Sequence, residues 1–182
     1  MSQELSSSFL DYYTEFSERE YSLISFERVF GGASRETYKI HVKDKSENEE
    51  KLILRISQDS SLIDTDQKTE YLAYSAFQDS KVPVPVMIDM SEEDNKLGAS
   101  FMLMRELKGE AATPFTPDVY SPHEEELGNQ FWSILGNIAK HEINDEIFEN
   151  FSKETKKPFW KNELDKWNNC LLYTSPSPRD GL

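Results

Sequence analysis

The fold is decided by the stretch "LISFERVFGGASRETYKIHV" (Leu23–Val42), which is followed after a charged segment by "KLILRI" (Lys51–Ile56). Three short runs rich in β-branched and aromatic residues are separated here by Gly31-Gly32 and by "KDKSENEE". Runs of this composition, divided by glycine or by polar residues, are typical of neighbouring antiparallel strands. The sequence therefore predicts a three-stranded antiparallel meander.

The two glycines of this meander allow two interpretations. Gly31 and Gly32 can adopt positive φ and let backbone N–H groups approach an anion, and Ser34 could add a hydroxyl donor. A plain hairpin turn is the commoner meaning of Gly-Gly between strands, and the pattern is not GxGxxG. Both a turn and a phosphate-covering hairpin remain open at this point.

The segments on either side of the meander predict an α+β protein. Residues 1–22 carry apolar side chains at helical spacing, including Phe9, Tyr13 and Phe16, and "VPVP" at Val82–Pro85 stops any helix. The further elements expected are a helix over Thr65–Asp79, strands over Val86–Met90 and Ser100–Leu107, and helices over Pro122–His141 and Lys156–Asn169.

One cation and one carboxylate stand out within these elements. Ile53 and Arg55 share a face of their strand, because side chains alternate with a period of two. Glu70 lies fifteen residues further on, on the apolar face of the next helix. A carboxylate on such a face requires a cation, and Arg55 is the obvious candidate. The alternative is two unrelated, solvent-facing charged side chains.

Composition limits the function classes. The 182 residues carry a formal net charge of −14, which argues against nucleic-acid and membrane-surface binding. No apolar run approaches the roughly 20 residues that span a bilayer, and the start has no cationic segment typical of a signal peptide. Cys170 is the single cysteine, so no internal disulfide and no Cys/His metal cluster is expected, and a cytoplasmic location is predicted.

The last segment, "CLLYTSPSPRDGL" (residues 170–182), does not fit the rest of the chain. A disordered Ser/Pro tail is one interpretation. However, Cys170–Asp180 can be written back into codons that resemble a transposase adapter used in sequencing-library preparation, with a compatible codon edge at Asn169. We therefore expect 170–182 to be a non-native tail and the natural protein to continue past Asn169.

Four motifs in order resemble the aminoglycoside phosphotransferase-like family of small-molecule kinases. They are "GGASRETYKI", "LILRI", "TEYLAYSAFQDSKVPVPVMID" and "GASFMLMRELKGE", within about residues 24–141. The likeness is greatest to the branch related to kinase domains of acyl-CoA dehydrogenase-associated proteins, which also carries Arg in the third strand. Two residues depart from the family pattern: Arg35 stands where Asn is frequent, and Arg105 where an acidic residue is common.

The resemblance implies a protein-kinase-like small lobe over 23–105, made of a five-stranded antiparallel sheet and one helix, and an inter-lobe linker with the start of a large lobe over 106–169. It also implies that the Gly31–Ser34 hairpin covers nucleotide phosphates and that Arg55, held by Glu70, contacts them. Ile53 would roof the adenine, and the linker backbone would bind the adenine edge. The linker residues are Met104, Arg105, Glu106 and Leu107.

The expected function is that of an ATP- or GTP-dependent phosphotransferase that uses Mg²⁺ and acts on a hydroxyl of a small molecule. The family's His-Gly-Asp loop, which supplies the base and metal ligands, is not found, since neither His41, His123 nor His141 begins it. We therefore expect a truncated, inactive chain and interpret His141 as structural. Alternatives are a non-catalytic nucleotide-binding or regulatory kinase-like protein, or an acidic α+β interaction domain. The acceptor and the oligomeric state are not predicted.

Overall fold

The computed structural model describes residues 2–30, 35–57, 67–92, 95–109 and 120–144, and beyond these only residues 147, 149, 161, 164, 165, 167 and 168. The chain divides into two units, Met1–Glu142 and Ile143–Leu182. All elements discussed below belong to the first unit. Of the second unit, the described residues within the predicted helix over Lys156–Asn169 are helical.

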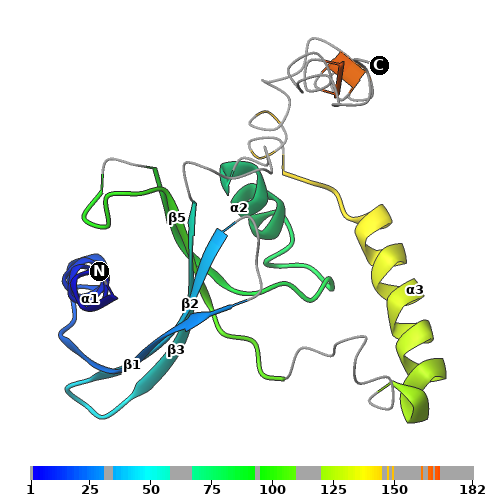
Figure 1. Ribbon diagram of the computed structural model, residues 1–182. Coiled ribbons are helices and arrows are strands. Elements are labelled where there is room, and N and C mark those ends of the chain that lie inside the picture. Colours follow the sequence, from blue (N-terminus) through cyan, green and yellow to red (C-terminus); the bar gives the residue numbers. More distant parts are fainter. Residues whose placement is uncertain are drawn as a thin grey trace, which may run out of the picture. The chain divides into compact units, whose positions relative to one another are not determined.

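The first unit is built on a five-stranded antiparallel sheet (Figure 1). Its strands lie in the order β1-β2-β3-β5-β4, so that β5 is inserted between β3 and β4. The predicted meander and the two later strands are confirmed, and each end differs from the prediction by no more than two residues. The strands are β1 (Tyr21–Val29), β2 (Arg35–Asp44), β3 (Glu49–Ser57), β4 (Met87–Ser91) and β5 (Phe101–Arg105).

The central strand β3 shows the alternation that its sequence predicts. Leu52, Leu54 and Ile56 are buried on one face, whereas Ile53 and Arg55 on the other face are only partly buried. Because residues paired across antiparallel strands point to the same side, this alternation assigns the neighbouring strands to faces as well.

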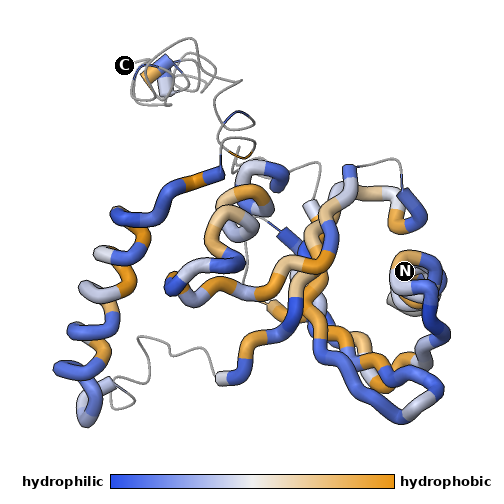
Figure 2. The backbone as a smooth tube through the Cα atoms, turned by 180° about the vertical axis from the view of Figure 1, so that it is seen from behind, coloured by the Kyte–Doolittle hydropathy of each residue, from blue (hydrophilic) through white to orange (hydrophobic). Residues whose placement is uncertain are grey.

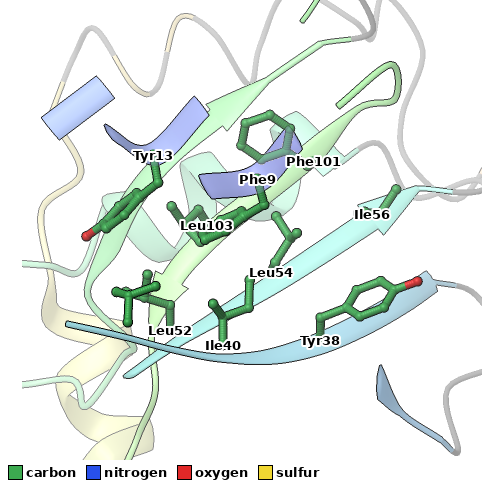
Figure 3. Packing of buried hydrophobic residues seen from close by; sticks show 10 residues of the cluster. Phe9, Tyr13, Tyr38, Ile40, Leu52, Leu54, Ile56, Phe101 and Leu103 are labelled. Atoms are coloured by element: carbon green, nitrogen blue, oxygen red, sulfur yellow. The ribbon is translucent and has the colours of Figure 1, made fainter. Parts of the chain in front are cut away.

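The helix α1 (Ser2–Ser17) covers the face that carries Leu52 and Leu54. Its Phe9 and Tyr13 are fully or almost fully buried, and Figure 3 shows the Phe9 ring lying against Leu103 and Leu54. The main hydrophobic core therefore lies between α1 and the sheet. The amphipathic N-terminal helix predicted from the aromatic spacing is confirmed, but it ends at Ser17, and β1 begins at Tyr21 within the range 1–22 that was expected to be helical.

The helix α2 (Gln67–Ser75) lies on the other side of the sheet from α1 (Figure 1). It is shorter than predicted, because the residues after Ser75 continue in tighter turns, with Phe77 N–H bonded to the Tyr74 carbonyl and Ser80 N–H to that of Phe77. Its predicted start falls outside the described residues. This placement brings α2 against the face of the sheet that α1 leaves open.

The predicted helix over Pro122–His141 forms a short 3-10 turn, Ser121–His123, followed by α3 (Glu124–Lys140). His141 is the C-cap residue of α3. The Nε2 of its ring lies 2.7 Å from the Ala76 carbonyl oxygen, and the ring centroids of His141 and Phe77 are 4.9 Å apart. These contacts give His141 a structural role, as expected. Among the described helices, none is long and apolar enough to cross a membrane.

Candidate functional site

The face of the sheet opposite α1 brings together the side chains that sequence reasoning singled out. Arg55 on β3 is paired with Thr37 on β2 and Met102 on β5, and Ile53 is paired with Lys39 and Met104. Met102 and Met104 are buried, and Ile53 is partly buried. The face therefore has an apolar part around Ile53 and Met104 and a cationic part around Arg55.

Arg55 and Glu70 form the ion pair that the sequence predicts. The Nη1 of Arg55 donates to Oε1 of Glu70, which lies in the first turn of α2. The side chains are 26% and 21% exposed, so each is partly desolvated and still reached by solvent. An arginine in this setting keeps its charge and has donors left for a bound anion.

A second arginine binds the same carboxylate. The Nη1 of Arg35 lies 2.5 Å from Oε2 of Glu70, and its side chain is only 8% exposed. Arg35 is the first residue of β2, and it lies diagonally across from Arg55 on the same face. Sequence reasoning missed this contact and treated Arg35 as a departure from a pattern. No pattern within one strand reveals it, because it depends on the pairing of Thr37 with Arg55 across β2 and β3.

Gln67 anchors the start of α2 beside Arg55. It is 3% exposed, and its amide nitrogen donates to the Arg55 carbonyl at 2.7 Å. Its amide oxygen accepts from the hydroxyls of Ser57 at 2.9 Å and Ser100 at 3.0 Å. These bonds hold the start of α2 against β3 and the residue before β5, and they thereby fix the position of Glu70 along β3 beside Arg55.

The segment after β5 runs beside the apolar part of the face. The Arg105 N–H donates to the Val86 carbonyl and the Glu106 N–H to the Lys51 carbonyl, both at 2.9 Å. Within the described part of the chain, the Leu107 N–H makes no hydrogen bond, and the Leu107 side chain is 63% exposed. Of the N–H groups of Arg105, Glu106 and Leu107, the first two are therefore already paired with backbone carbonyls.

The side chains of this segment point to opposite faces. Arg105 reaches Glu50 on the α1 side at 3.2 Å, whereas Glu106 pairs with Lys39 at 3.1 Å on the face that carries Ile53. Glu50 also accepts hydrogen bonds from the hydroxyls of Tyr13 at 3.0 Å and Tyr21 at 2.8 Å. Burial and this carboxylate raise the pKa of both tyrosines above the usual value. Through Glu50, Arg105 thus links the end of β5 to Tyr13 of α1.

Gly31, Gly32 and Ser34, the residues predicted to cover phosphates, lie outside the described residues. The described residue before them, Phe30, is 82% exposed, and the guanidinium of Arg28 lies 5.6 Å from its ring centroid. No group of three or more His, Cys, Asp or Glu side chains that could hold a metal ion occurs among the described residues.

The five-stranded antiparallel sheet with helices on both sides defines an α+β protein with the architecture of a protein-kinase-like small lobe. The profile of the phosphotransferase enzyme family (APH) matches residues 25–175, which is more than four fifths of the chain. The chain belongs to this family.

Two solved structures are similar to the chain. One is described as a "putative aminoglycoside phosphotransferase" from Ralstonia eutropha JMP134, with 20% identity, a TM-score of 0.44, and coverage of 59% of this chain and 29% of that one. The other is described as a "putative fructosamine-3-kinase" from Thermobifida fusca YX-ER1, with 17% identity, a TM-score of 0.35, and coverage of 58% and 33%. The chain thus spans about a third of the length of these proteins. No curated protein matches it.

Proposed function

We propose that the chain is the nucleotide-binding part of an ATP-dependent phosphotransferase that acts on a hydroxyl group of a small molecule. Family membership supports a phosphotransferase. The observation that supports the nucleotide site is the Arg55–Glu70 ion pair, which lies on the sheet face opposite α1 next to the partly buried Ile53. GTP in place of ATP would use the same groups.

The two parts of the face fit the two ends of a nucleotide. Ile53 is only partly buried and offers an apolar surface for a purine ring, with its buried cross-strand neighbour Met104 beside it. Arg55 lies two residues along β3, which places its Cα about 6–7 Å away. A guanidinium at that distance, still 26% exposed, can donate to phosphate oxygens. The hairpin of Gly31, Gly32 and Ser34 follows β1 at this cationic end and is proposed to cover the phosphates.

The backbone after β5 is proposed to bind the edge of the purine. The N–H groups of Arg105 and Glu106 already have carbonyl partners, so Leu107 is the residue of this segment whose N–H can donate to a ring nitrogen. The Arg105 side chain points to the α1 side and takes no part. This restricts the proposed contribution of the Met104–Leu107 segment to the Met104 side chain and the backbone near Leu107.

A bound Mg²⁺ would offset negative charge on the transferred phosphoryl group. The described residues provide no cluster that fits such an ion, and no step is assigned to it in this chain. The arginine–carboxylate face, in contrast, fits the phosphates of a nucleotide. Binding of the nucleotide, and not transfer, is therefore the activity proposed for the chain itself.

We also propose that the natural protein continues past Asn169. The helix α3 presents five large apolar side chains to solvent, and Figure 2 shows hydrophobic segments along its length. These side chains are Leu127, Phe131, Trp132, Leu135 and Ile138, which are 40–69% exposed. An apolar surface of this extent marks a contact surface, and a downstream part of the enzyme would cover it.

Sequencing the genomic locus tests this continuation. The reading frame should depart from the Ser/Pro tail after Asn169 and reach a His-Gly-Asp motif with an Asn five residues after the Asp. The family match itself extends to residue 175 and does not mark the junction. The same tail in the genome would overturn the continuation, and a continued frame without the motif would favour a non-catalytic nucleotide-binding protein.

Titration of the chain with ATP, followed by NMR so that millimolar affinities are measurable, tests the nucleotide site. Arg55→Ala should weaken ATP binding about tenfold or more, because a charge-assisted contact to phosphate is lost. Arg28→Ala is the matched control, since Arg28 pairs with Tyr38 on the opposite face of the same sheet and forms its own ion pair with Glu36. Equal binding by all three proteins, or by none, would rule out the proposed site.

A further inference from the structure

Glu70 is shared between two arginines, each of which binds one of its carboxylate oxygens. Its Oε1 accepts from Arg55 and its Oε2 accepts from Arg35. Arg55 comes from β3, Arg35 from the first residue of β2, and Glu70 from α2. Three elements therefore meet at a single carboxylate.

An arginine alone with a carboxylate commonly binds it through two parallel N–H···O bonds. Here that arrangement is not present: Arg55 donates to Oε1 alone, and Oε2 accepts from Arg35. Arg55 is left with a single bond from Nη1, and the rest of its guanidinium makes no other side-chain hydrogen bond within the described part of the chain. The remaining donors of Arg55 stay available to another anion.

The two arginines differ in exposure. The Arg35 side chain is 8% exposed, whereas that of Arg55 is 26% exposed. Arg35 is thus buried behind the carboxylate, and Arg55 is the arginine that a ligand reaches. Because Glu70 is shared between two cations, it neutralises Arg55 less completely than it would in an isolated Arg55–Glu70 pair.

We propose that Arg35 is a positioning residue that makes this face selective for phosphate-bearing nucleotides, an inference that rests on the nucleotide site proposed above. By holding Oε2 of Glu70, Arg35 keeps Arg55 in a single contact and directs the free edge of its guanidinium to the nucleotide phosphates.

The alternative is that Arg35 only stabilises the fold. A purely structural arginine would affect the binding of ATP and of adenosine by the same factor, since both use the same apolar surface. A positioning role predicts a loss confined to ligands that carry phosphates. The ratio of the two affinities separates these cases.

The experiment is a titration of the chain and its Arg35→Gln variant with ATP and with adenosine, followed by NMR. In Arg35→Gln, both oxygens of Glu70 can close on Arg55, so the Kd for ATP should rise about tenfold and that for adenosine less than threefold. The salt dependence of ATP binding should also become weaker. Arg35→Lys, which still donates to Oε2, should retain most of the wild-type ratio.

Arg28→Gln serves as the matched control on the opposite face, and dispersed amide resonances establish that each variant folds. Should Arg35→Gln not fold, Arg35→Met supplies an uncharged side chain of similar length. An unchanged ATP-to-adenosine ratio in the uncharged variant would overturn the role of Arg35 while leaving the nucleotide site intact, provided that Arg55→Ala still weakens ATP binding. If Arg55→Ala binds ATP as well as wild type, both proposals fail together.

Discussion

Replacing Glu70 by Gln provides a direct test of the three-residue cluster that does not depend on any ligand. The change removes the negative charge between Arg35 and Arg55 and leaves two guanidinium groups facing each other. The neutral amide can still accept at its oxygen, but its NH₂ group cannot accept from the second arginine. Glu70→Gln should therefore destabilise the folded state.

The magnitude follows from Coulomb's law. Two unit charges roughly 6 Å apart repel by about 3 kcal/mol at an effective dielectric constant of 20 and by less than about 1 kcal/mol in bulk water. Arg35 is 8% exposed and Arg55 is 26% exposed, so the site lies between these limits. We expect Glu70→Gln to lower the free energy of unfolding by about 2 kcal/mol. Because the repulsion is screened, the loss should shrink in about 1 M salt.

Urea unfolding followed by circular dichroism measures this loss. The decisive comparison is the double variant Arg35→Gln/Glu70→Gln, in which the second substitution removes one of the two repelling charges. It should be more stable than Glu70→Gln alone, by about 1 kcal/mol. A double variant whose loss equals the sum of the two single losses would refute the shared carboxylate. A loss below about 0.5 kcal/mol for Glu70→Gln would do the same.

Three further predictions concern the packing around the site. Gln67→Leu should lower the free energy of unfolding by about 2–3 kcal/mol, because the Arg55 carbonyl and the hydroxyls of Ser57 and Ser100 lose their buried partner. Urea unfolding measures this loss. The control is Lys68→Leu, a substitution at the neighbouring, half-exposed residue. Phe9→Ala should cost about 3–5 kcal/mol, since its ring is fully buried in the core, and a loss below about 1 kcal/mol would contradict the docking of α1. Burial and the Glu36 hydrogen bond raise the pKa of Tyr38 from 10.0 to about 12. The stability that its neutral phenol contributes is therefore complete below pH 10 and should be lost as the pH rises to about 12. A Tyr38 phenolate absorbance, taken as the difference between the wild type and Tyr38→Phe, that titrates at about pH 10 without unfolding would contradict this.

Local sequence patterns were sufficient for most of the secondary structure. The period-two alternation of "KLILRI" correctly predicted that Arg55 and Ile53 share the face opposite the leucines. The aromatic spacing of residues 2–17 correctly predicted an amphipathic helix. These predictions succeeded because each depends on the geometry of a single element, which the chain specifies within a few residues.

The contacts that shape the candidate site could not be predicted in the same way. That Arg35 shares Glu70 with Arg55 depends on the register of β2 against β3, and a shift of one residue would turn Arg35 to the other face. That Arg105 binds Glu50 on the α1 side, and not a group on the face that carries Ile53, depends on β5 lying next to β3. Neither register nor strand order is contained in one element.

The sequence by itself determined the strands, the face on which Arg55 stands, and the need of Glu70 for a cationic partner, because hydrophobic periodicity and the cost of an unpaired carboxylate act locally. Only the tertiary structure decided that α1 covers one face while α2 brings Glu70 to the other. It also decided that a second arginine completes the cluster and that Gln67 holds α2 against both β3 and β5. These features arise from long-range packing of the sheet, where strand order and register select among partners that are far apart in the chain.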